Sequence, residues 1–147
     1  MNQISHDALI AAFDNRRVYR TPAVMIPPKT SILEITSIVN GTSNYSVKTE
    51  TLDLKSWTTV IISQLPQLDG TFSFSVKTGN TTISEVINTN AMQFTNATVY
   101  LNNPLNAPSN ALIRNMDIKT FPGISRGMHD FDHFCTSTAI LCRLYFG

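Results

Sequence analysis

The sequence predicts an all-β protein, an antiparallel β-sandwich, from three observations. Short segments rich in β-branched and aromatic residues are separated by turn signals at intervals of about 8 to 12 residues, as in sandwiches and barrels. No convincing helical period interrupts them. Charged residues make up only 14% of the 147 residues, and Ser, Thr and Asn take their place. A chain of this length suits one domain with its own core.

The N-terminal segment, residues 1–21, is poorly patterned. Asp7 is a candidate cap for a short helix through Phe13, but Asn15 and the arginines after it end the apolar period. The first expected strand is Ala23–Ile26, which a Pro-Pro pair ends because proline lacks the N–H that a ladder needs.

A hairpin follows. Asn40-Gly41 is a strong reverse-turn signal between the β-branched segment Ile32–Val39 and the alternating segment Tyr45–Leu52.

The next expected strand, Trp57–Gln64, places Val60 and Ile62 on one face and Ile61 on the other. An aromatic residue at the head of such a strand is usually part of the core, so we expect Trp57 there. The alternative is a platform on which a sugar stacks.

The clearest alternation runs over Thr71–Lys77, where Phe72, Phe74 and Val76 share one face. One covered face and one solvated face are typical of antiparallel sheets. The turn at Gly79-Asn80 leads into a returning strand over Thr82–Ile87.

The stretch Thr98–Thr120 predicts a strand, a loop and a second strand. Its loop, Asn102–Asn110, holds two prolines and four asparagines. We expect the flanking strands to supply apolar contacts through Val99, Leu101, Leu112, Met116 and Ile118. The sandwich domain is therefore expected over residues 22–120, and residues 121–147 form a tail of unassigned structure.

The order of these motifs resembles the concanavalin A-like, laminin-G-like jelly-roll domains of invertebrate extracellular proteins. The resemblance covers about two-thirds of the chain, and its most specific part is the final strand pair. The matching segments are TPAVMI (Thr21–Ile26), SIVNGTSNYS (Ser37–Ser46), LKSWTTVIISQ (Leu54–Gln64), DGTFSFSVKTGN (Asp69–Asn80), INTN (Ile87–Asn90) and FTNATVYLNNPLNAPSNALIRNMDI (Phe94–Ile118).

The chain departs from that family in two respects. Family members often carry a cysteine on each arm of the first hairpin, where this chain has Thr36 and Ser46, so that bridge would be absent. Such jelly rolls also have strands before TPAVMI, so the resemblance implies an N-terminally shortened domain. The segment Ala8–Phe13 is too short for a signal peptide. An extracellular location therefore implies a targeting signal that is not within this sequence.

Asparagines supply the candidate binding sites. Side-chain amides suit hydroxyl recognition because each supplies donors and an acceptor, although Asn is also an ordinary turn former. The candidate ligand loop carries Asn102, Asn103, Asn106 and Asn110. Four N-x-S/T sequons mark candidate N-glycosylation sites in a secreted protein: Asn40, Asn44, Asn80 and Asn96.

We expect no catalytic site, metal or cofactor. The three glutamates, Glu34, Glu50 and Glu85, lie on different expected strands and lack the spacing of paired hydrolase carboxylates. The cluster His129–His133 is too local to build a tetrahedral metal site without a scaffold. Cys135 and Cys142 are expected as free thiols, the alternative being a local disulfide.

These observations predict a non-catalytic extracellular binding or adhesion module whose partner is a glycan or an extracellular protein. A net charge of +1 gives no basis for nucleic-acid binding. The sequence contains no run of about 18 apolar residues, so we expect no membrane insertion. The alternatives are a structural jelly-roll subunit of a viral or phage particle, and a glycoside hydrolase-like enzyme on the same fold.

Overall fold

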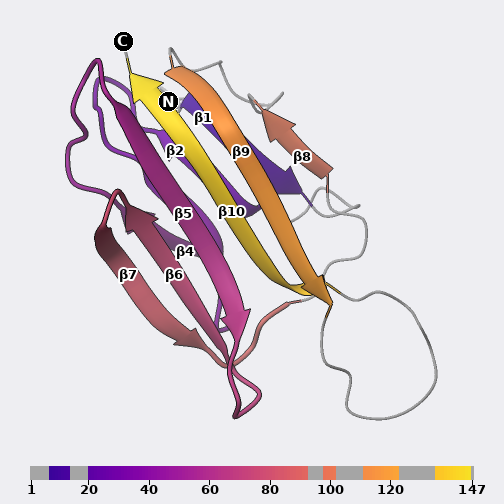
Figure 1. Ribbon diagram of the computed structural model, residues 1–147. Helices are drawn as coiled ribbons and strands as arrows, with labels where there is room; N and C mark the ends of the chain where they lie inside the picture. Colours follow the sequence, from indigo (N-terminus) through magenta and orange to yellow (C-terminus); the bar gives the residue numbers. More distant parts are fainter. Residues whose placement is uncertain (1–6, 14–19, 93–97, 102–110, 123–134, 147) are drawn as a thin grey trace.

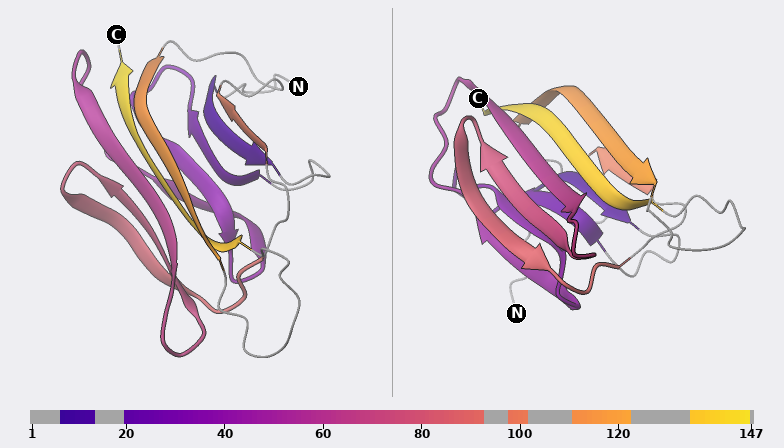
Figure 2. Two further views of the ribbon diagram at one scale, coloured as in Figure 1. Left: turned by 45° about the vertical axis from the view of Figure 1, so that its right-hand side comes forward. Right: turned by 60° about the horizontal axis from the view of Figure 1, so that its bottom comes forward.

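The chain forms two antiparallel β-sheets packed face to face, as the sequence predicts (Figures 1 and 2). The computed structural model describes residues 7–13, 20–92, 98–101, 111–122 and 135–146, and this part contains no helix. The all-β antiparallel sandwich is therefore confirmed. The concanavalin A-like jelly roll stays a prediction.

The first sheet has five strands in the order β4-β3-β2-β1-β8. Each strand pairs antiparallel with its neighbours. Thr36 lies directly opposite Ser46 in the β3–β4 ladder. The strands are β1 (Asp7–Phe13), β2 (Arg20–Ile26), β3 (Glu34–Val39), β4 (Thr42–Lys48) and β8 (Thr98–Leu101).

The second sheet also has five strands, in the order β7-β6-β5-β10-β9, and lies in front in Figure 1. All its pairings are antiparallel. Its strands are β5 (Trp57–Pro66), β6 (Phe72–Thr78), β7 (Thr81–Asn88), β9 (Ala111–Pro122) and β10 (Cys135–Phe146).

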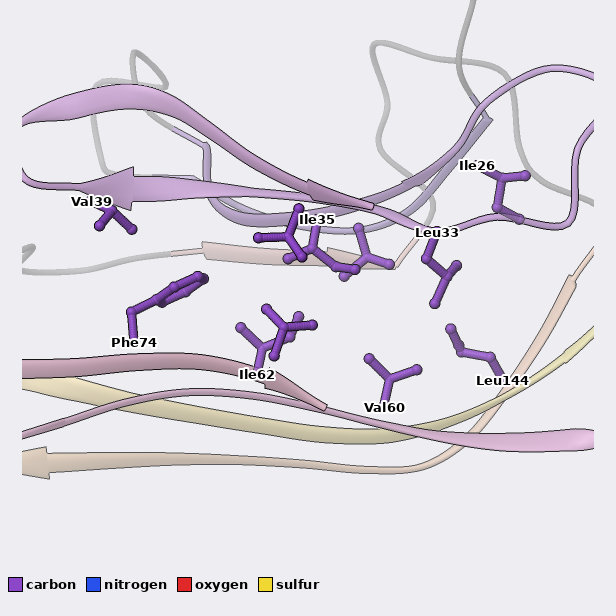
Figure 3. Packing of buried hydrophobic residues seen from close by; sticks show 11 residues of the cluster. Ile26, Leu33, Ile35, Val39, Val60, Ile62, Phe74 and Leu144 are labelled. Carbon is purple, nitrogen blue, oxygen red and sulfur yellow. The ribbon is translucent and has the colours of Figure 1, made fainter. Parts of the chain in front are cut away.

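The core lies between the two sheets because each sheet turns one apolar face inward. Figure 3 shows Ile35 and Leu33 of one layer pointing toward Ile62 and Val60 of the other. Across the same interface, the ring of Tyr45 meets the ring of Phe74 edge-on, with centroids 5.9 Å apart. The buried cluster comprises Val24, Ile26, Leu33, Ile35, Val39, Val47, Val60, Ile62, Phe74, Val76 and Leu144.

Two strands lie outside the expected domain bounds of 22–120. The segment considered as a short helix, Asp7–Phe13, is instead β1 and pairs with β2 and β8. The expected tail contains β10, which lies between β5 and β9. Leu144 of β10 is fully buried in the core. β1 pairs with β8, and β10 pairs with β5, each of them far away in sequence, and a local pattern does not show such pairings.

The expectation that Leu112, Met116 and Ile118 share one face is wrong for Leu112. Met116 packs against the core, whereas Leu112 is 60% exposed. The register between β9 and β10 shifts at a bulge, where Asn115 adopts a φ of 51°. This bulge accounts for the exposure of Leu112. Such a bulge exchanges the inward and outward faces of a strand.

The other apolar contacts expected from this stretch have different outcomes. Leu101 is 53% exposed, so its expected burial is also wrong. Ile118 is half-buried. The side chain of Val99 lies outside the described part of the chain.

Candidate functional site

The outer face of the second sheet carries a group of aromatic, cationic and apolar side chains at one end. Trp57 at the start of β5 lies directly opposite Tyr145 of β10, and their ring centroids are 5.3 Å apart. The guanidinium carbon of Arg114 lies 3.7 Å from the centroid of the Trp57 ring. We call Trp57, Leu112, Arg114, Arg143 and Tyr145 the outer cluster. It lies where β10 ends, near the C label in Figure 1.

Strand alternation places these side chains away from the core. Val60 and Ile62 point inward on β5, so Trp57 belongs to the opposite face. On β10 the buried Leu144 turns its neighbours Arg143 and Tyr145 outward.

The expected core position of Trp57 is therefore wrong, and its side chain is 36% exposed. The signal was present in the sequence, because Trp57 lies an odd number of residues from Val60 and an even number from Ile61.

Two positive charges face each other in the outer cluster. Arg114 and Arg143 are directly opposite in the β9–β10 ladder, and both are exposed. Like charges in this position destabilise a sheet. Among the described residues, neither arginine has an ion pair with a carboxylate. Asp117, further along β9 opposite Leu141, already has an interaction of its own.

A second polar feature, buried at one end of the sandwich, ties the sheets together. Asn88, the last residue of β7, is fully buried. Its Nδ2 donates to the carbonyl of Ile38 (3.3 Å) and to Oε1 of Gln64 (2.8 Å). Its Oδ1 accepts from the backbone N–H groups of Asn40 (2.9 Å) and Asn90 (3.2 Å). These bonds join the β3–β4 turn to the second sheet.

The candidate glycosylation site at Asn40 belongs to this inter-sheet tether. Its Nδ2 donates to the carbonyl of Ile87 (3.1 Å), and its Oδ1 accepts from N of Thr89 (2.7 Å). The adjacent Gly41 has a φ of 75°, and an added Cβ would come within 2.9 Å of the Asn90 side chain. Asn40 therefore has a structural role, and its glycosylation stays a prediction.

The other asparagine candidates fall in different settings. Asn44 is exposed on β4, and Asn80 is exposed in the turn between β6 and β7. Asn96 and the candidate ligand loop lie outside the described residues, as do the His129–His133 cluster and the side chains of Cys135 and Cys142. The loop's residues are Asn102, Asn103, Asn106 and Asn110.

The described acids occupy separate positions. Glu34 lies in the first sheet and accepts from Ser46 Oγ at 2.8 Å, whereas Glu85 lies in the second and accepts from Ser73 Oγ at 3.2 Å. Asp69 accepts from both the hydroxyl and the N–H of Thr71, and these bonds lower the pKa of its carboxyl. Asp69 thus stabilises a turn.

Two properties of the described part concern metals and membranes. No group of three or more His, Cys, Asp or Glu side chains there is arranged to hold a metal ion. No helix there is long and apolar enough to cross a membrane.

We found no match for the chain among protein-family models, curated proteins or solved structures.

Proposed function

We propose that the chain is a non-catalytic binding or adhesion module of the extracellular space, built on a concanavalin A-like sandwich, with a glycan or a protein as its ligand. The outer cluster carries this proposal. Trp, Tyr and Arg are the residue types that contribute most affinity at recognition surfaces. Here they are gathered at one end of a sheet face, with Leu112 exposed beside them.

Composition and acid placement support the same function. The low charge and the many Ser, Thr and Asn residues suit an extracellular surface, and Asn44 and Asn80 are exposed sequon positions. Glu34 and Glu85 lie on different sheets, so these two carboxylates do not form the closely spaced pair that glycoside hydrolysis requires.

Intrinsic fluorescence offers a direct binding assay, because Trp57 is the single tryptophan of the chain and lies in the outer cluster. We would first screen the full chain on an array that carries both glycans and extracellular proteins. Titration with each hit should change the Trp57 emission. A thermal-shift series with calcium and sugars would run in parallel.

Absence of any ligand for a folded sample would contradict the proposal. Size-exclusion chromatography separates it from the particle-subunit alternative. A large closed assembly would favour a structural subunit.

A further inference from the structure

The outer cluster has the features of a receptor for carboxylates. We propose that it binds an acidic segment of a partner protein in which Asp or Glu side chains flank an apolar one. This inference rests on the proposed binding function and specifies the ligand at the same site.

The stacking of Arg114 favours a carboxylate over a sugar. Its guanidinium covers one face of the Trp57 ring at 3.7 Å, and Tyr145 packs against the same indole. A sugar that stacks on Trp57 would have to displace the guanidinium from that face. A stacked guanidinium, in contrast, keeps the N–H donors at its edge, where they can bind a carboxylate in bidentate geometry.

Arg143 supplies the second positive charge. It lies directly opposite Arg114, and both residues are exposed, an arrangement in which like charges repel. A carboxylate bound between them removes this repulsion and forms charge-assisted hydrogen bonds. Charge complementarity therefore selects an anionic ligand.

An apolar contact lies beside the charges. Leu112 is 60% exposed and stands directly opposite Tyr145, in the row of the sheet next to the two arginines. A peptide can present an apolar side chain next to a carboxylate at this spacing, whereas the hydroxyl groups of a glycan would lose water against Leu112 without forming hydrogen bonds. A protein segment fits both halves of the cluster.

The test uses the full chain and a short fluorescein-labelled Gly-Ser peptide that carries Glu and Leu side chains. We expect saturable binding by anisotropy, together with a change in Trp57 emission. A matched peptide with Gln in place of Glu should bind at least about tenfold more weakly, as expected for the loss of charge-assisted hydrogen bonds. Binding should also weaken at about 1 M salt, where the Debye length falls to about 3 Å.

Variants locate the interaction. Arg114→Gln and Arg143→Gln should each weaken binding of the Glu peptide about tenfold. Lys77→Gln is the control, since it removes the same charge from an exposed residue of β6 on the same sheet. It should leave binding unchanged. Circular dichroism would verify that every variant is folded.

Four results would overturn the inference. Equal binding of the Glu and Gln peptides would exclude recognition of the carboxylate. Equal losses in the Lys77 and Arg114 variants would show a diffuse charge effect. Binding of a neutral or sulfated glycan at Trp57, with no peptide binding, would make the ligand a glycan and leave the proposed binding function standing. If no peptide, protein or glycan binds, both this inference and the proposed binding function are contradicted.

Discussion

The tether at Asn88 predicts a large loss of stability when its side-chain amide is removed. Asn88→Ala deletes four hydrogen bonds at a fully buried position. The groups left behind include the Ile38 carbonyl, the Gln64 amide and the Asn40 N–H, which belong to three separate strands or turns. The substitution therefore weakens the attachment of one sheet to the other.

The expected cost follows from the burial of each bond. The bond to the Ile38 carbonyl is buried, and a buried group left without its partner costs about 1–3 kcal/mol. The bonds to Gln64, Asn40 and Asn90 are partly exposed, and each contributes about 0.5–1.5 kcal/mol. Water can replace part of the exposed bonding, so we expect the free energy of unfolding to fall by about 2–4 kcal/mol in total.

Urea denaturation followed by far-UV circular dichroism measures this loss. The matched control is Asn44→Ala, an exposed asparagine on β4, which should change the free energy of unfolding by less than about 0.5 kcal/mol. If the free energy of unfolding of Asn88→Ala lies within about 0.5 kcal/mol of the wild-type value, the tether does not join the sheets as described.

Three further predictions concern the core, the bulge and a turn. Leu144→Ala should lower the free energy of unfolding by about 2–5 kcal/mol in the same assay, whereas the exposed Leu112→Ala should change it little. Asn115→Val should destabilise the bulge by about 1–2 kcal/mol because a β-branched residue resists a φ of 51°, whereas Asn115→Gly should be tolerated. The Asp69 carboxyl should titrate below its ordinary pKa of 3.8 by NMR, and Thr71→Val should raise that midpoint. Because this pKa is lowered in the folded state, its stabilising contribution is present above the ordinary value and is lost as the pH falls through the lowered one. The core argument is contradicted if the two leucine variants lose equal stability, and the bulge argument if Asn115→Val leaves the free energy of unfolding unchanged. The turn argument is contradicted if Thr71→Val leaves the Asp69 midpoint where it is in the wild type.

The candidate site was only partly predictable. The sequence drew attention to Trp57 but predicted it in the core, and it indicated nothing about Arg114 or Arg143. These arginines lie far from Trp57 in sequence, and they share one end of the sheet with it only because β10 pairs with both β5 and β9. The asparagine loop that the sequence favoured lies outside the described residues.

The sequence by itself determined where most strands run. Alternation within Thr71–Lys77 and the turn at Asn40-Gly41 are local properties, since side chains alternate every two residues and a left-handed turn favours Asn and Gly. The observed strands β3, β5, β6 and β7 agree with the expected ones to within two residues at each end. β4 begins three residues and ends four residues before the expected segment Tyr45–Leu52.

Tertiary structure alone decided how the strands combine. It placed β10 in the middle of the second sheet, reversed the faces of β9 at Asn115, and brought Asn88 beneath the β3–β4 turn. Each of these outcomes depends on pairing between residues distant in the chain, whose stability comes from burial and cross-strand contacts that no local period encodes.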